Sequence, residues 1–138
     1  ESSFTTLFLG HTVAGSPLTI SDSRLTTTGS RVVGFYKVST ASPVTILRST
    51  LEARTGTGAC IESMAAVTDC PVAITDSTVA AMGYGVQFSA GPATRSGLTL
   101  VDSKIVTVHD PLNFNWFDLT ADPVDSDVLV DNSHLTHS

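Results

Sequence analysis

The chain repeats one eight-residue stretch, which first occurs as Leu18-Thr19-Ile20-Ser21-Asp22-Ser23-Arg24-Leu25. Each copy alternates an aliphatic residue with a mostly polar one, reaches a serine in the sixth place and returns to an aliphatic residue in the eighth. The copies begin at Leu18, Val44, Val72, Leu98 and Val128, with 26, 28, 26 and 30 residues between successive starts. A recurring spacing of this kind indicates a repeat architecture.

Each copy predicts a strand, a corner and a second strand. Alternation with period two is typical of a β-strand with one buried face, and the serine marks the place where the strand breaks. A second apolar run follows each of the first four copies, so three strands per repeat is the simplest expectation. These runs are Val32–Tyr36, Ala59–Ile61, Val86–Phe88 and Phe114–Phe117.

The repeat predicts an all-β fold, a right-handed parallel β-helix (β-solenoid) of about five coils. The repeats are rich in Thr, Val, Ser and Gly and lack a helical apolar stripe, which excludes a helical solenoid. A β-sandwich also has short strands, but they face different surroundings and have no reason to share one motif. In a β-helix equivalent residues stack about 4.8 Å apart, so the same side chain recurs.

The chain of 138 residues is expected to form one domain with one core, because 41% of it is hydrophobic. Residues 1–17 are predicted to form a partial coil with a strand over Phe4–Leu9, and residues 128–138 a partial last coil. The complete coils are 18–43, 44–71, 72–97 and 98–127. Since neither end shows a polar cap, we expect the chain to be a segment of a longer solenoid.

The stacking predicts columns of equivalent residues. Three aliphatic columns form the expected core: Leu18, Val44, Val72, Leu98 and Val128; Ile20, Ile46, Ile74, Leu100 and Val130; and Leu25, Leu51, Val79, Ile105 and Leu135. A serine column lies at the corner and comprises Ser23, Ser49, Ser77, Ser103 and Ser133. At a bend, a hydroxyl can bond backbone groups that have no ladder partner.

Charge narrows the range of partners. The formal net charge of -6 would repel a phosphate backbone, so nucleic acid is not an expected partner. No stretch approaches the roughly 18 apolar residues of a membrane span. The phosphate-binding, dinucleotide-binding and zinc-protease motifs are missing, and we expect no cofactor and no metal site.

Cys60 and Cys70 are the only cysteines. They close a short loop, which predicts a disulfide in an oxidising compartment. The alternative is two unpaired buried thiols, because free cysteine behaves as a small hydrophobe.

The strongest enzyme-like feature is the acidic column Asp22, Asp76 and Asp102, with Asp131 one place earlier in its copy. Carboxylates on neighbouring coils can perform acid/base chemistry on a glycosidic bond. The structural interpretation is that Asp before a corner serine bonds nearby backbone N–H groups. Arg48, in the same column, would then neutralise its neighbours.

The most aromatic segment is Phe114–Phe117, which contains Trp116 and Asn115 and follows Asn113. An aromatic ring beside amide side chains can bind a sugar, with Tyr84 as a companion in a nearby coil. The alternative is that these rings belong to the core. His109 and Asp110, with Lys104 and Asn113, form a weaker set for an acid/base pair or a calcium-assisted lyase site.

The unit aliphatic-x-aliphatic-x-Asp-Ser-x-aliphatic, followed by Gly and a short apolar strand, resembles the passenger domains of pertactin-like Gram-negative autotransporters. The resemblance covers residues 18–135. Two departures are Arg48, where other copies have Asp or Asn, and the missing translocator barrel. The resemblance implies export through the periplasm to the outer membrane and cell surface, or secretion.

The resemblance also implies adhesion, self-association or host interaction, and it supplies no catalytic residue. The expected partner is a host-cell surface or another copy of the chain, with a glycan as a further option. A membrane would be engaged only through the missing translocator. Polysaccharide lyases, glycosidases and phage tailspikes share the architecture, so a carbohydrate-binding or carbohydrate-degrading β-helix is the alternative.

Overall fold

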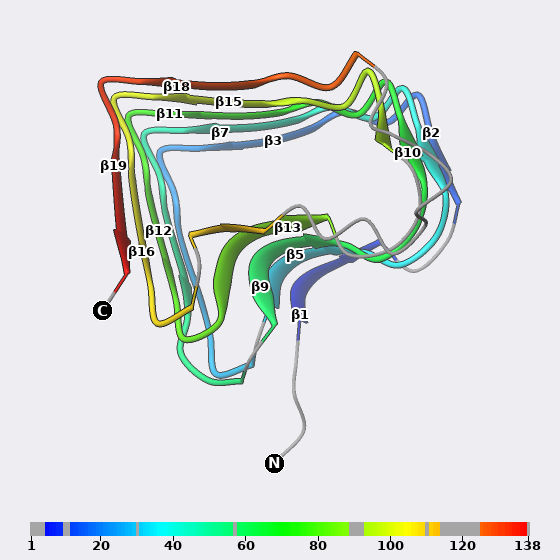
Figure 1. Ribbon diagram of the computed structural model, residues 1–138. Helices are drawn as coiled ribbons and strands as arrows, with labels where there is room; N and C mark the ends of the chain where they lie inside the picture. The colour runs from blue at the N-terminus through cyan, green and yellow to red at the C-terminus, as the bar shows by residue number, and fades with distance from the viewer. Residues whose placement is uncertain are drawn as a thin grey trace.

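A computed structural model describes residues 5–9, 12–29, 31–56, 58–88, 93–109, 111–113 and 125–137. These residues form a parallel β-solenoid of about four turns, in which four sheets make the sides of the coil (Figure 1). Each strand pairs in parallel with its equivalent in the next coil. The predicted all-β solenoid fold is therefore confirmed, although it has about four turns where five coils were predicted.

Sheets C and D carry the repeated stretch. Sheet C contains β3 (Leu18–Ser21), β7 (Val44–Leu47), β11 (Val72–Thr75), β15 (Leu98–Val101) and β18 (Val128–Asp131). Sheet D contains β4 (Arg24–Thr27), β8 (Thr50–Ala53), β12 (Thr78–Ala81), β16 (Lys104–Thr107) and β19 (His134–His137). A two-residue corner separates the two sheets in every copy.

Sheets A and B close the coil. Sheet A contains β1 (Thr5–Leu9), β5 (Arg31–Phe35), β9 (Ala59–Ser63), β13 (Tyr84–Phe88) and β17 (Leu112–Asn113). Sheet B contains β2 (Val13–Ala14), β6 (Ser39–Thr40), β10 (Val67–Thr68) and β14 (Ala93–Thr94). The prediction of three strands per repeat is wrong, because sheet B adds a fourth whose two residues are too few to show alternation.

Most predicted strand positions are confirmed. Strand β1 covers the predicted Phe4–Leu9 except for Phe4, which lies outside the described residues. Strands β5, β9 and β13 occupy the first three apolar runs. The fourth run, Phe114–Phe117, also lies outside the described residues.

The three aliphatic columns stack as predicted. Ile46 pairs with Ile74, and Ile74 with Leu100, in one column of sheet C. All three side chains are fully buried, whereas Val130 in the last coil is 41% exposed. The core is therefore continuous through the middle coils and open at β18 and β19.

In sheets C and D buried and more exposed residues alternate along each strand of the middle coils, whereas sheet A lacks this alternation. Val32 and Val33 are both fully buried, and so are the neighbours Cys60 and Ile61 in the next coil. Figure 1 shows β5, β9 and β13 bending strongly where they leave sheet D. Burial in sheet A therefore does not follow the period of two that a strand with one buried face shows.

Candidate functional site

The first corner, between sheets C and D, holds the acidic column. Asp22, Arg48, Asp76, Asp102 and Asn132 occupy equivalent positions with φ between 42° and 49°. This left-handed conformation costs an ordinary side chain about 1–2 kcal/mol, and Asp and Asn tolerate it best. Local backbone geometry therefore explains the acidic column without catalysis.

Within this column charges are paired between coils. Arg48 Nε and Nη2 donate to the two carboxylate oxygens of Asp22 at 2.6 and 2.7 Å. These hydrogen bonds lower the pKa of Asp22 from its ordinary value. Asn132 donates its side-chain amide to Asp102. The predicted neutralising role of Arg48 is confirmed for Asp22.

An open depression of about 380 Å³ lies beside this corner at the C-terminal coils. Its lining includes Asp76, Asp102, Lys104, Asn132 and His134. The groups come from three successive coils and combine two carboxylates, an amide, an ammonium group and an imidazole. Such an arrangement can hydrogen-bond a polar ligand such as a sugar, but its openness gives little exclusion of water.

The predicted serine column is continuous. The Ser49 N–H donates to Ser77 Oγ at 3.0 Å, and the Ser77 N–H donates to Ser103 Oγ at 3.0 Å. Each hydroxyl in turn donates to a carbonyl two residues earlier, as Ser77 does to Thr75 at 2.6 Å. Ser23 and Ser133 continue the column at its two ends. The column ties neighbouring coils together at the corner.

A second corner, between sheets B and C, has the same construction and was missed by the sequence reasoning. Gly15, Ala41, Asp69, Arg95 and Asp125 have φ between 47° and 61°. The next residue is Ser16, Ser42, Cys70, Ser96 or Ser126. The Cys70 N–H donates to Ser96 Oγ, and the Ser96 N–H donates to Ser126 Oγ, both at 3.0 Å.

The second corner also contains an ion pair. Arg95 Nε donates to Asp69 Oδ1 at 2.5 Å, and Nη2 to Oδ2 at 2.7 Å. These hydrogen bonds lower the pKa of Asp69 from its ordinary value. The sequence does contain a signal for the ladder of Ser and Cys residues at the second corner. Each of these residues lies two residues before the start of a repeat copy.

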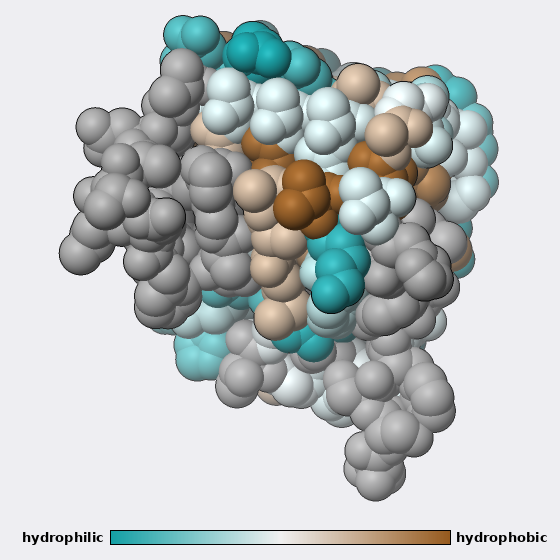
Figure 2. Space-filling view, turned by 90° about the vertical axis from the view of Figure 1, so that its right-hand side faces the viewer, coloured by the Kyte–Doolittle hydropathy of each residue, from teal (hydrophilic) through white to brown (hydrophobic). Residues whose placement is uncertain are grey.

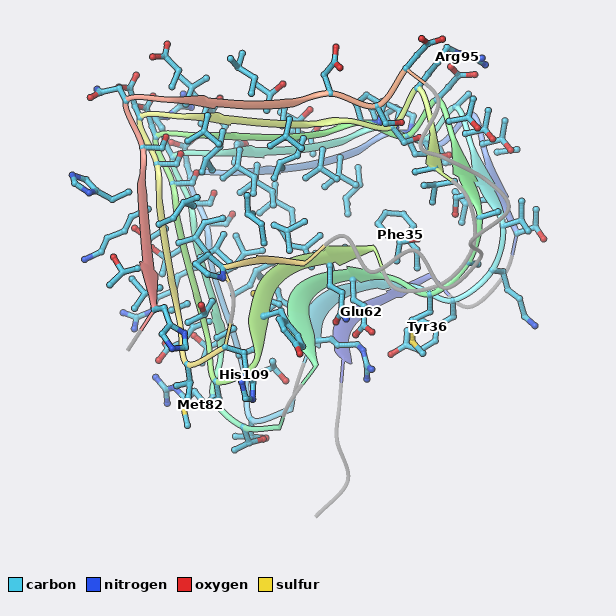
Figure 3. The ribbon with its side chains drawn as sticks, viewed as in Figure 1. Phe35, Tyr36, Glu62, Met82, Arg95 and His109 are labelled. Atoms are coloured by element: carbon cyan, nitrogen blue, oxygen red, sulfur yellow. The ribbon has the colours of Figure 1, made fainter. Side chains whose placement is uncertain are left out.

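Sheet A carries a buried ion pair that the sequence did not predict. Arg31 Nε donates to Glu62, whose side chain is 5% exposed, and the Arg31 guanidinium lies 5.6 Å from the centre of the Tyr36 ring. Burial opposes a charge on Arg31, but Glu62 outweighs it and raises the pKa of Arg31. In Figure 3, Phe35 points into the coil, whereas Glu62 and Tyr36 lie on the other side of sheet A. Since Arg31 engages the carboxylate, the pair favours a structural role.

The corner between sheets D and A presents apolar and aromatic groups. The Tyr84 and His109 rings lie 5.4 Å apart, and Met82 and Val108 are 48% and 37% exposed. Figure 3 shows Met82 and His109 at this corner. A depression of about 470 Å³ beside it, on the outer face of sheet D, is also lined by Ala80 and Val106.

The remaining predicted ligand-binding residues are only partly described. Asn113 belongs to β17, but its side chain is outside the described residues. Trp116, Asn115 and Asp110 lie outside them altogether. The structure therefore places Tyr84 beside His109 and does not bring the predicted aromatic set together within its described part.

Sheet B faces the viewer in Figure 2, which shows side chains of mostly intermediate hydropathy, a small hydrophobic area and a hydrophilic area beside it. Val38 and Met64, 50% and 39% exposed, are the large apolar side chains that precede this sheet in their coils. Thr40, Thr68 and Thr94 form one column on the sheet. This face offers no charged cluster among its described residues.

The structure does not contain the predicted disulfide: Cys60 and Cys70 are both free and buried. Cys60 belongs to β9, whereas Cys70 follows β10 at the second corner. The residues between them run as extended strands along two sides of the coil, so they do not form a short loop that would bring the two cysteines together. A disulfide needs Cα atoms within about 7 Å. Burial raises the pKa of the Cys60 thiol, which makes it a poor nucleophile.

Neither a metal site nor a membrane helix is found in the part of the chain that the structure describes. No three His, Cys, Asp or Glu side chains there are placed to hold a metal ion. No helix there is long and apolar enough to cross a membrane.

Comparisons with known proteins give no match. No protein-family model matches the chain, and neither does a curated protein or a solved structure. The resemblance to autotransporter passengers therefore remains a proposal.

Proposed function

We propose that the chain is a surface-exposed or secreted passenger segment of the autotransporter type, acting in adhesion, self-association or host interaction. The observation that carries the proposal is the outer face of sheet C. Its five stacked strands form a continuous face between the two charged corners. Thr19, Thr45 and Thr99 stand in one outward column of this face, with Ala73 between them.

A face of this kind suits contact with a large partner. Small-molecule sites are usually concave and enclose most of the ligand, whereas protein interfaces need an extended complementary surface. The outward residues of sheet C mix hydroxyl and aliphatic side chains. One column holds Thr19, Thr45, Ala73, Thr99 and Leu129, and the other holds Ser21, Leu47, Thr75, Val101 and Asp131. Asp22, the first carboxylate of the acidic column, is already occupied by Arg48, which favours binding over catalysis.

The test is adhesion of host cells to the immobilised chain. The variant Thr19→Arg/Thr45→Arg/Thr99→Arg changes the sheet C face, and Thr40→Arg/Thr68→Arg/Thr94→Arg makes a matched change on sheet B. We expect cell retention above that of albumin, loss of about tenfold in the sheet C variant because bulky cations disrupt the contact, and little change in the sheet B variant. Retention no greater than albumin would contradict the proposal.

A second candidate is a carbohydrate-binding or carbohydrate-degrading β-helix, which the depression beside Asp76 and Asp102 favours. Carboxylates on neighbouring coils with Lys104 and His134 nearby provide hydrogen-bonding and proton-transfer groups. The decisive assay measures new reducing or unsaturated ends released from a polysaccharide panel. Release by the wild type that Asp76→Asn lacks would replace the adhesive proposal with this one.

A further inference from the structure

The depression on the outer face of sheet D is centred on a small residue. Ala80 lies between Glu52 and Val106 in one outward column of the sheet. Met82 and Val108 follow two residues later on the same face and are 48% and 37% exposed. Figure 3 shows Met82 on the outside of the coil. Because Ala80 carries only a methyl group, the face is hollowed between its larger neighbours.

The depression lies on a side of the solenoid and not at an end of the stack. Its lining comes from β8, β12 and β16, and β4 and β19 pair on the two sides of these strands. Stacking of coils along the axis therefore adds strands beside this face and none over it. Apolar side chains that are exposed together beside a polar rim mark an interaction site, whereas scattered ones need no explanation.

The rim of the depression has an excess of positive charge. Arg54 Nε and Nη2 donate to the Glu52 carboxylate at 3.0 and 3.1 Å, and Arg24 Nη2 donates to it at 3.4 Å. One carboxylate cannot neutralise two guanidinium groups, so one positive charge is left on this face of a chain whose net charge is -6. The carboxylates of Asp76 and Asp102 lie across the first corner, at the other end of the coil side that β12 and β16 form.

We propose that this depression binds a short segment of a partner protein in which an apolar side chain stands beside a carboxylate. The apolar side chain fills the hollow over Ala80, between Met82 and Val108. The carboxylate pairs with Arg54, which belongs to the lining and is 54% exposed. The site lies on a different face from sheet C and does not depend on the adhesive proposal.

The contact is made by side chains and not by strand addition. Strand β12 is paired with β8 on one side and with β16 on the other, so its backbone groups already have partners within sheet D. A partner can therefore reach only the outward side chains. An apolar centre with a charged rim is the usual construction of such an interface.

The size and lining of the depression favour a peptide side chain over a lipid or a sugar. Three neighbouring strands span about 10 Å, which suits one large side chain and is too short for an extended acyl chain. A sugar would need several convergent hydrogen-bonding groups, which Ala80, Met82 and Val106 do not supply. The flexible thioether of Met82 can adapt to aliphatic and aromatic partners alike.

The experiment is fluorescence anisotropy of the full chain with two sets of labelled synthetic peptides. In one set a single Phe, Leu or Trp is flanked by Asp residues, and in the other Lys replaces Asp. We expect saturable binding of the acidic set with a Kd on the order of 10–100 µM, which is typical of one apolar anchor. The Lys set should bind at least about tenfold more weakly, and added salt should weaken the acidic set.

Two pairs of variants locate the site. Ala80→Phe fills the hollow and should lower the affinity for the acidic set by about tenfold or more, whereas Ala73→Phe adds the same ring on sheet C of the same coil and should leave it unchanged. Arg54→Gln should lower the affinity by about threefold, the size expected of an exposed ion pair. Arg48→Gln, which removes an arginine at the first corner, should have no effect. Far-UV circular dichroism confirms that the variants are folded.

Three results would overturn the proposal: no saturable binding of the acidic set, equal binding of the Lys set, or equal loss in Ala80→Phe and Ala73→Phe. Phosphatidylglycerol vesicles test the lipid alternative. Vesicle binding that Ala80→Phe abolishes, without binding of either peptide set, would assign the depression to a membrane surface and overturn the peptide site.

Discussion

The two corners that flank sheet C use one backbone solution with different side chains. Each places a residue in the left-handed conformation directly before a ladder residue. At the first corner the left-handed residues are polar or charged and every ladder residue is a serine. At the second corner Gly15 and Ala41 take two of the left-handed positions, and Cys70 interrupts the ladder.

The comparison indicates that the geometry of a corner depends on a left-handed residue followed by a hydroxyl-bearing one. The charge of the left-handed residue matters less to this geometry. Ala41 has φ 49° although its side chain can make no hydrogen bond. Asp22–Arg48 and Asp69–Arg95 pairs occur at both corners, but all four side chains are at least 43% exposed. Exposed ion pairs contribute little, because solvent screens them.

Removing a central hydroxyl should have the largest effect at either corner. Ser77→Ala deprives the Ser49 N–H of its acceptor, and Ser96→Ala does the same to the Cys70 N–H. An unsatisfied buried donor costs about 1–3 kcal/mol, so both variants should lose a similar free energy of unfolding in urea titrations. A neutral Ser96→Ala beside a destabilised Ser77→Ala would show that the corners are not equivalent.

Relief of the left-handed conformation should have the next largest effect. Ala41→Gly should raise the free energy of unfolding by about 1 kcal/mol, because Gly adopts positive φ without a steric cost. Asp76→Gly, at the first corner, should gain less, because Asp tolerates this conformation. Equal gains in thermal unfolding would mean that the acidic residues have no conformational advantage.

Repairing the interrupted ladder should have a smaller effect. Cys70 donates its thiol to the Thr68 carbonyl at 3.2 Å, and it borders a cavity of about 10 Å³. Cys70→Ser should stabilise the fold by about 0.5–1 kcal/mol, because a hydroxyl donates and accepts better than a thiol. Cys70→Ala, which has neither function, should destabilise it, and the reverse order of the two variants would contradict the ladder.

The exposed ion pairs should have the smallest effect, and it should depend on pH and salt. The folded state lowers the pKa of Asp22 and Asp69, so their stabilisation is present above the ordinary value of 3.8 and is lost as pH falls through the lowered values. Asp22→Asn/Asp69→Asn should therefore flatten the acid limb of a stability–pH curve. An unchanged acid limb would mean that neither pair contributes.

The coil, its core columns and the first serine ladder could be predicted because each depends on a repeated pattern. The second ladder repeats equally well, but it lies outside the alternating stretch and includes Cys70. The two-residue strands of sheet B are too short for periodicity. The Arg31–Glu62 pair joins residues in different coils that no repeat relates. The disulfide prediction was wrong because it rested on the short sequence separation of Cys60 and Cys70, and the residues between them form extended strands rather than a loop.

The central claim is that successive copies of the repeat stack in register. Spin labels at Thr19→Cys and Leu129→Cys, in a Cys60→Ala/Cys70→Ser background, mark equivalent outward positions four coils apart. Pulsed electron paramagnetic resonance should give one narrow distance of about 19 Å, because strands stack about 4.8 Å apart, before the label linkers add a few ångström. A broad distribution, or a distance near twice this value, would contradict the stacked solenoid.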